Sequence, residues 1–160
     1  TLLSCFKEYG MRVLGIDPIL HIAEIAKKNG VPTLTEFFSE NFSKEIKKNY
    51  GSAEIILANN LVANIDDLDE FIRGIKNLMN RDSVFLFETF YLPLQIRNFV
   101  WDFTYHEHLS YFRVEPLKKY FEKLGMEIID VETNLIKGGL VPPIPLNPTL
   151  NTFSIKYLLR

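Results

Sequence analysis

The stretch AEIILANN, residues 53–60, predicts the fold class of this chain. Five of its first six residues are apolar, and the run is too short for a helix but has the length and composition of a buried strand. A nearly continuous apolar run is typical of a strand in a parallel sheet that is covered on both faces. Two asparagines, Asn59 and Asn60, follow where this strand should end.

Helical patterns and further strand-like runs alternate on both sides of this stretch. DDLDEFIRGIKNLMN (66–80) is amphipathic with acids in its first turn, as a helix dipole favours, and SVFLFETFYL (83–92) is a further strand. Strands that alternate with helices of about 10–15 residues predict an α/β domain, with a parallel sheet covered by helices on both faces. The other expected helices are 1–10, 18–30, 39–51 and 115–125, and the other expected strands are 11–17, 31–34 and 126–135.

Two segments depart from this alternation. Residues 92–112 are aromatic and are expected to be irregular. The stretch GGLVPPIPLNPTLN (138–151) holds four of the eight prolines and cannot form a central strand, because proline lacks the backbone N–H that a ladder needs. TFSIKYLL (152–159) alternates again, and we expect it to add an edge strand.

The composition excludes several classes of protein. A chain of 160 residues can bury the core of one domain, and a net charge of -2 without a basic stripe argues against a nucleic-acid surface. No apolar run approaches the ~18 residues of a membrane span. The single cysteine, Cys5, permits no internal disulfide, so we expect a cytoplasmic protein. The chain opens in a helical pattern without a methionine or a signal peptide, and we expect it to be part of something longer. The sequence gives no oligomeric state.

Polar residues that follow the apolar runs are candidate ligand-binding residues, because ligands bind beyond the carboxyl ends of parallel strands. Asp17 either accepts hydrogen bonds from the ribose hydroxyls of a cofactor or caps the helix that starts at Pro18. Asn59 and Asn60 either present their amides to a zwitterionic ligand or close a turn. Glu88 lies inside an apolar run and is expected either at the open end of its strand or in a pair, because a buried unpaired charge is costly.

The cluster TYHEHLSYF (104–112) contains two of the three histidines and allows three interpretations. A zinc site would use His106 and His108, which share a side of an extended segment, but no third ligand stands at suitable spacing. A structural loop would leave the histidines partly exposed and pack the tyrosines. An acid–base cluster would combine an imidazole, a carboxylate that orients it and a tyrosine hydroxyl that bonds a developing oxyanion.

These stretches together resemble the S-adenosylmethionine (SAM)-dependent sugar C-methyltransferases. The resemblance is carried by GMRVLGIDP, AEIILANNLVANIDDLDEF, FLFETFYL and above all FTYHEHLSYF followed by EPLKKYFEKLGMEIIDVE. It implies a Rossmann-like class I methyltransferase sheet, a partial methyltransferase domain over 1–139 and a divergent proline-rich tail over 140–160. The family acts on nucleotide-activated keto-deoxysugars, typically dTDP-linked, which are the implied partners.

The resemblance also implies roles for the acceptor-side residues. A carbon next to a ketone loses a proton when the enolate is stabilised, and it then attacks the sulfonium methyl group. His108 would be the base that removes the proton. Tyr105 and Glu107 would position the sugar and His108 and stabilise the enolate oxygen. The resemblance assigns no role to His106.

On the cofactor side, the resemblance implies that Asp17 holds the ribose of SAM and that Asn59 and Asn60 line its methionine side. No metal site is implied within this chain, because zinc belongs to a cysteine-rich amino-terminal domain of the family that has no counterpart here. The first strand and its glycine-rich loop, of the form E-I-G-x-N-D-G, have no counterpart either. Their absence implies a missing central strand between residues 11–17 and 53–60.

We therefore expect the 160-residue chain to bind SAM weakly and to be inactive alone. Asn64 adds to this expectation, because it stands where relatives often carry a histidine. Two alternatives remain open: a related methyltransferase that acts on another small carbonyl substrate, and a non-catalytic fragment that keeps part of the fold.

Overall fold

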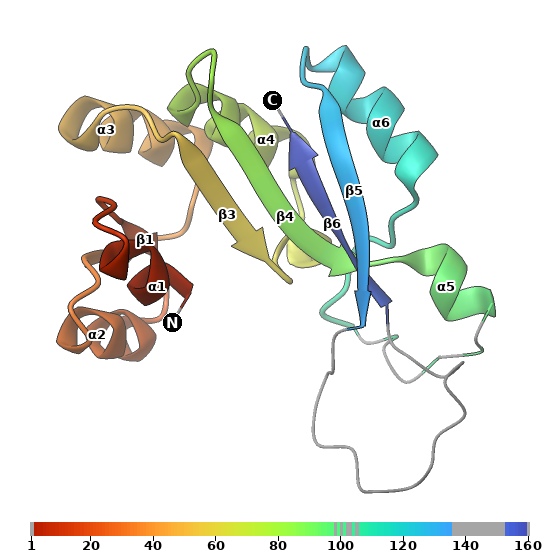
Figure 1. Cartoon of the computed structure of the whole chain (residues 1–160), viewed down its shortest axis with the longest axis horizontal. Coiled ribbons are helices and arrows are strands. Elements are labelled where there is room, and N and C mark those ends of the chain that lie inside the picture. Colours follow the sequence, from red (N-terminus) through yellow and green to blue (C-terminus); the bar gives the residue numbers. More distant parts are fainter. Residues whose placement is uncertain are drawn as a thin grey trace, which may run out of the picture. The chain divides into compact units, whose positions relative to one another are not determined.

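The computed structural model of the chain describes residues 2–97, 99, 101, 104, 106–135 and 153–159 (Figure 1). Its helices are α1 (Leu2–Glu8), α2 (Leu20–Lys28), α3 (Glu40–Tyr50), the 3-10 helix η1 (Val62–Asn64), α4 (Leu68–Leu78), α5 (Leu92–Arg97) and α6 (Val114–Lys123). Its strands are β1 (Gly15–Ile16), β2 (Thr33–Leu34), β3 (Ile55–Asn59), β4 (Val84–Phe90), β5 (Ile128–Leu135) and β6 (Phe153–Leu159). The predicted alternation is confirmed, and α5 is a helix in a stretch that was expected to be irregular.

Two compact units make up the chain. The first contains Thr1–Gly51 and Glu70–Leu78, and the second contains Ser52–Asp69 and Met79–Arg160. Within the described part of the chain, no helix combines the length and the apolar character that crossing a bilayer requires.

The first unit contains a short parallel strand pair and a helix, α3, with defined caps at both ends. β1 pairs with β2, and the ladder ends where the Asp17 N–H donates to the Leu34 carbonyl at 3.1 Å. The Ser39 hydroxyl accepts the Phe42 N–H at 3.1 Å at the start of α3, as the capping pattern predicts. At the other end of α3 the chain turns at Gly51, whose φ of +87° lies in the left-handed region that glycine adopts without a steric cost.

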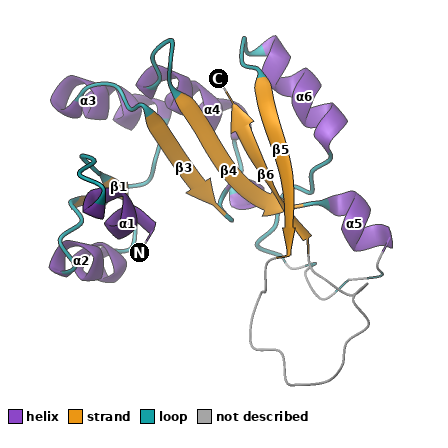
Figure 2. Ribbon diagram, viewed as in Figure 1, coloured by secondary structure: helices purple, strands orange, loops and turns teal. Residues whose placement is uncertain are grey.

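The second unit is built on a mixed four-stranded sheet in the order β3-β4-β6-β5 (Figure 2). β3 and β4 run parallel, with Asn59 opposite Glu88 at their carboxyl ends. β6 is antiparallel to both β4 and β5 and lies between them. The predicted parallel pairing is found for β3 and β4, but the sheet is mixed, and residues 152–159 were wrongly expected at its edge. Antiparallel β6 can enter the sheet at this place because its outward-directed backbone groups find partners on both sides.

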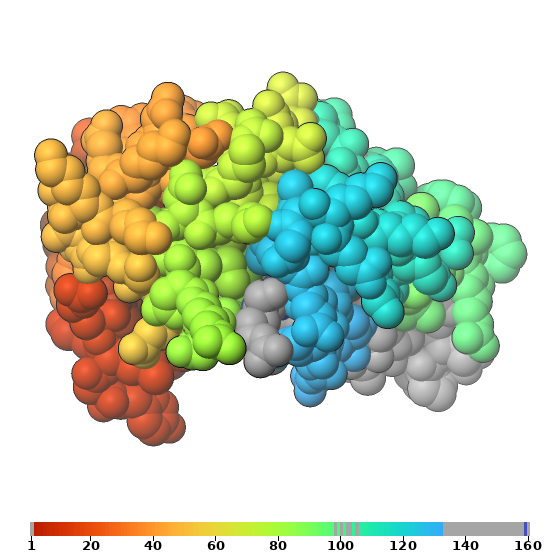
Figure 3. Space-filling view, turned by 90° about the horizontal axis from the view of Figure 1, so that it is seen from above, coloured from red at the N-terminus to blue at the C-terminus, as the bar shows by residue number. Residues whose placement is uncertain are grey.

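One face of this sheet is covered by α6. Phe85 and Phe87 are fully buried on β4, with ring centroids 5.4 Å apart, and Phe87 lies 5.9 Å from the ring of Phe121 on α6. Leu117, one turn earlier on α6, is also buried. Figures 1 and 3 show α6 beside β5. The alternation of side chains along β4 thus orients its two aromatic rings towards α6.

The described strands form two parallel pairs. β1 pairs with β2 alone, β3 pairs with β4 alone, and the two pairs belong to different sheets. β1 and β3 each have one edge without a strand partner among the described residues, and the missing strand that the resemblance implies stays a prediction.

Candidate functional site

The loop that carries His108 is held at the carboxyl ends of β3 and β4. The backbone N–H groups of Leu109 and Ser110 both donate to the carbonyl of Ala63 in η1, at 2.8 and 3.1 Å. At the end of the loop, Phe112 forms a parallel bridge with Tyr91, the residue that follows β4. Backbone bonds to two elements therefore determine where the loop lies, and they bring it to the sheet edge at which ligands of α/β proteins bind.

The imidazole of His108 is packed between aromatic rings. Its ring centroid lies 4.8 Å from that of Phe90 at an interplanar angle of 50°, and 5.9 Å from that of Tyr111 at 81°. The side chain is half-buried. Edge-to-face and tilted contacts of this kind restrict the orientation of a ring while one of its edges can still reach solvent or a ligand.

The other members of the cluster are less enclosed. His106 and Glu107 form a turn, and both are exposed. Tyr105 lies outside the described residues, so its predicted role stays a prediction. The ring contact with Phe90 at the end of β4 is therefore made by His108, and Glu107, one residue earlier, is exposed.

Asn59 and Asn60 lie at the carboxyl end of β3, as predicted, and both are exposed. Asn60 has a φ of +51°, a left-handed conformation that asparagine adopts more readily than most residues, and its N–H donates to the Glu88 carbonyl at 2.9 Å. Glu88 itself is buried at the same end of the sheet, with 5% of its surface exposed. The turn and the amide-presenting interpretations are compatible, because the backbone closes the turn and the two side chains face solvent.

Asp17 lies in the first unit, directly after β1. Its Oδ1 accepts the Ile19 N–H at 2.9 Å, just before α2 begins at Leu20. The N-cap position itself is occupied by Ile19, which makes no side-chain cap bond. Asp17 therefore bonds the N–H of the N-cap residue instead of being the N-cap itself. This bond uses Oδ1, and Oδ2 of Asp17 can still accept a hydrogen bond from a ligand.

The described residues contain no group of three or more histidine, cysteine, aspartate or glutamate side chains that could hold a metal ion. An acidic run at the start of α4 borders an open hollow of about 480 Å³. Its lining residues are Asp66, Asp67, Leu68 and Asp69, and the Asp69 carboxylate accepts a 2.7 Å hydrogen bond from the Tyr120 hydroxyl.

Reasoning from the sequence did not identify the partners of His108. Phe90 was assigned only to a buried strand, and Tyr111 only to the aromatic cluster. The signal for Tyr111 was its place three residues after His108. Nothing in the local pattern pointed to Phe90 or to the Ala63 carbonyl, which lie 18 and 45 residues before His108.

Comparisons with known proteins place these residues in context. Residues 1–131 match the family model described as "Methyltransferase domain". The C-methyltransferase NovU of Streptomyces niveus is 33% identical over 139 residues, which are 87% of this chain. The chain spans 33% of the length of that relative.

Solved structures share the fold at low sequence identity. A SAM-dependent methyltransferase from Archaeoglobus fulgidus has a TM-score of 0.69 and 14% identity, covering 99% of this chain and 80% of the other. The 1,6-didemethyltoxoflavin-N1-methyltransferase of Burkholderia thailandensis, solved with S-adenosylhomocysteine, has a TM-score of 0.62 and 17% identity, covering 99% and 64%. These similarities confirm the predicted class I methyltransferase fold.

Proposed function

Because the chain belongs to the methyltransferase-domain family, we propose that it forms the acceptor-side part of a SAM-dependent C-methyltransferase. The acceptor is a nucleotide-activated deoxysugar with a ketone, and the methyl group goes to the carbon next to that ketone. The relative NovU, itself a C-methyltransferase, supports carbon as the methylated atom. The half-buried His108 imidazole, held against Phe90 at the end of β4, carries this proposal.

His108 acts as the base in this reaction. An imidazole nitrogen takes the proton from the carbon next to the ketone, and the electron pair of the C–H bond moves into a carbon–carbon double bond while the ketone oxygen becomes an enolate. Tyr105 and Glu107 are proposed to position the sugar and to stabilise the enolate oxygen. The aromatic rings around His108 hold the imidazole in place, so the base does not need to reorganise during proton transfer.

Asp17, Asn59 and Asn60 are proposed to hold the cofactor. Two observations fit this role: Oδ2 of Asp17 remains available beyond the end of β1, and both asparagine side chains are exposed beyond the end of β3. A carboxylate there can accept hydrogen bonds from ribose hydroxyls, and amides there can bond an amino-acid group. SAM held by these residues would supply an electrophilic methyl group, and its methyl–sulfur bond would break as the enolate carbon takes the methyl group, leaving S-adenosylhomocysteine.

The base role can be tested without the cofactor, because the expected inactivity of the chain alone concerns methyl transfer and not proton removal. The chain is incubated in D₂O with a dTDP-linked keto-deoxysugar, and NMR follows the loss of the proton signal next to the ketone. We expect exchange faster than in buffer, because removal of that proton precedes methyl transfer. A control sugar with a hydroxyl in place of the ketone should show no exchange, since its carbanion has no carbonyl group into which the charge can delocalise. A folded chain that binds the keto-sugar but leaves its exchange at the buffer rate would overturn the proposal.

A further inference from the structure

A second hollow, of about 250 Å³, opens in the same unit at the start of α6. Three leucines and two tyrosines supply most of its walls, and one arginine supplies its only charge among the described lining residues. These residues are Leu68, Leu92, Leu117, Tyr111, Tyr120 and Arg113. The volume lies just below the ~300–1,000 Å³ of pockets for drug-sized ligands, so the hollow suits one ring with short substituents.

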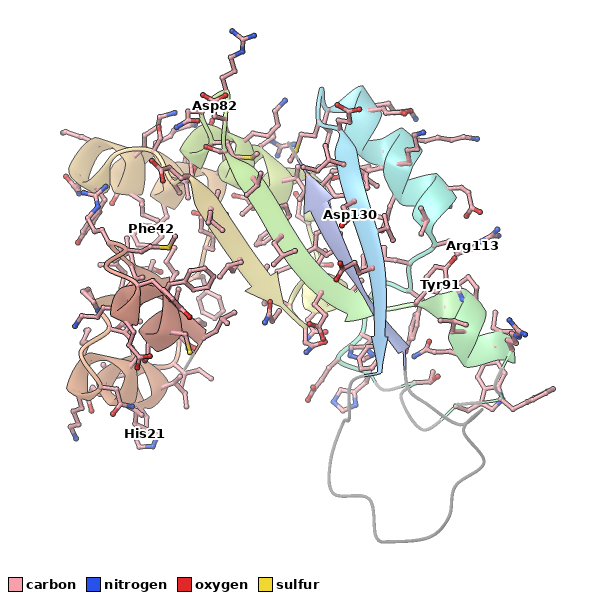
Figure 4. All side chains as sticks on the ribbon, viewed as in Figure 1. His21, Phe42, Asp82, Tyr91, Arg113 and Asp130 are labelled. Atoms are coloured by element: carbon pink, nitrogen blue, oxygen red, sulfur yellow. The ribbon has the colours of Figure 1, made fainter. Side chains whose placement is uncertain are left out.

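Hydrogen bonds hold the walls of this hollow in place. The Leu92 N–H donates to the Phe112 carbonyl at 3.1 Å, which joins the start of α5 to the residue before Arg113. The hydroxyl of Tyr120, a lining residue, donates to Asp69 at 2.7 Å. Figure 4 shows Tyr91 and Arg113 at the neighbouring starts of α5 and α6. The hollow is therefore preformed, which lowers the ordering cost of binding.

The lining suits a flat ring that carries an anion. Tyrosine faces and leucine side chains favour a planar, weakly polar group, which can stack on them. The Arg113 guanidinium lies 3.6 Å from the Glu115 carboxylate, and both side chains are more than half exposed. An exposed ion pair of this length contributes little free energy, so the guanidinium can exchange it for a bidentate phosphate contact.

The hollow is connected to His108 through a shared residue. Tyr111 lines the hollow, and its ring centroid lies 5.9 Å from that of His108 at nearly a right angle. A ligand that stacks on Tyr111 in the hollow therefore lies close to the imidazole of His108. We propose that the hollow binds the pyrimidine nucleoside diphosphate of the acceptor, with the base against the tyrosines and the diphosphate at Arg113. This inference rests on the proposed function and adds where the acceptor's nucleotide binds.

Binding of thymidine 5′-diphosphate to the chain, measured by calorimetry, tests this site. Arg113→Gln is expected to weaken binding by about tenfold, because a charge-assisted contact is lost. Arg81→Gln is the matched control: it removes the same charge in the same unit, next to Asp82 at the opposite end of β4 from Tyr91 (Figure 4). The control should bind like the unmodified chain.

Two further ligands test the recognition of the base. Adenosine 5′-diphosphate should bind more weakly than thymidine 5′-diphosphate, because a two-ring base exceeds the hollow, and pyrophosphate should bind more weakly still. Leu92→Trp, which fills the hollow, should reduce the affinity for thymidine 5′-diphosphate to the affinity for pyrophosphate. Equal affinity for all three ligands, an unchanged affinity in Arg113→Gln, or no binding at all would each overturn the site.

The outcome separates this site from the function itself. If the chain catalyses proton exchange in the keto-sugar but Arg113→Gln leaves nucleotide binding unchanged, the hollow is not the nucleotide site and the proposed reaction stands. If nucleotide binding depends on Arg113 but no proton exchange occurs, the hollow is a nucleotide site and the proposed reaction is wrong.

Discussion

The imidazole of His108 lies against the ring of Phe90, the last residue of β4, with centroids 4.8 Å apart. A side chain from an irregular loop is thus oriented by a residue on a regular strand. The strand is rigid because it pairs with β3 on one side and β6 on the other. Precise orientation of a catalytic group by a rigid element is what general-base chemistry requires.

Phe90→Leu tests this relationship. Leucine keeps an apolar side chain in place but removes the ring contact, which is worth roughly 0.5–1.5 kcal/mol. We expect proton exchange in the keto-sugar to slow by about three- to tenfold, because His108 becomes less well oriented. Phe99→Leu is the control, since Phe99 is 81% exposed in the same unit. Equal rates in the two variants would show that the ring contact does not orient the base.

His108→Ala and His106→Ala form a second matched pair. The chain carrying either change is joined to an upstream glycine-rich strand and loop, so that SAM binding and methyl transfer can both be measured. His108→Ala should lower the transfer rate by about 10²–10⁴-fold and leave the SAM dissociation constant unchanged, because a general base acts on the acceptor. His106→Ala should retain most activity, since His106 is exposed. Unchanged turnover in His108→Ala would remove His108 from the base role.

The 160-residue chain by itself should bind SAM with a dissociation constant weaker than about 1 mM. The sequence contains no glycine-rich strand–loop segment whose backbone could approach the cofactor, so Asp17, Asn59 and Asn60 would act without it. Calorimetry measures the affinity before and after such a segment is added before residue 1. A submillimolar constant for the unextended chain would contradict the expectation.

The stability of the first unit should depend on pH through Glu40. The hydrogen bond from Arg73, at 2.8 Å, and that from Lys44, at 3.0 Å, lower the pKa of Glu40 below its ordinary value of 4.5. A carboxyl group with a lowered pKa in the folded state stabilises the fold above the unfolded-state pKa, and this contribution disappears as pH falls through the folded-state pKa. At pH 7, Glu40→Gln should therefore have a lower melting temperature than the unmodified chain. The margin between the two melting temperatures should be small, because the pair is partly exposed.

This margin should close as the pH falls below 4.5. Glu45→Gln, on the same helix, is the control and should show no such pH-dependent difference. Thermal melts followed by circular dichroism between pH 3 and 7 measure both variants. A margin for Glu40→Gln that stays constant over this range would exclude the carboxylate pair as its cause.

Reasoning from the sequence succeeded where the cause is local. The apolar run at 53–60 became β3, and the Ser39 and Gly51 signals marked the two ends of α3. Capping bonds and left-handed turns join residues a few positions apart, so the sequence alone specifies them. The short helix α5 was missed because residues 92–97 begin with a leucine–proline pair and have too few residues for a period to show.

The sequence by itself determined the element order, the methyltransferase-like motifs and the positions of polar residues after the strands. Only the tertiary structure decided that β6 lies between β4 and β5, that His108 packs against Phe90, and that the N–H groups of the next two residues reach the Ala63 carbonyl. The physical reason is distance along the chain. Strand insertion and ring packing depend on which surfaces remain unpaired after the local elements have formed, and no short window of sequence contains both partners.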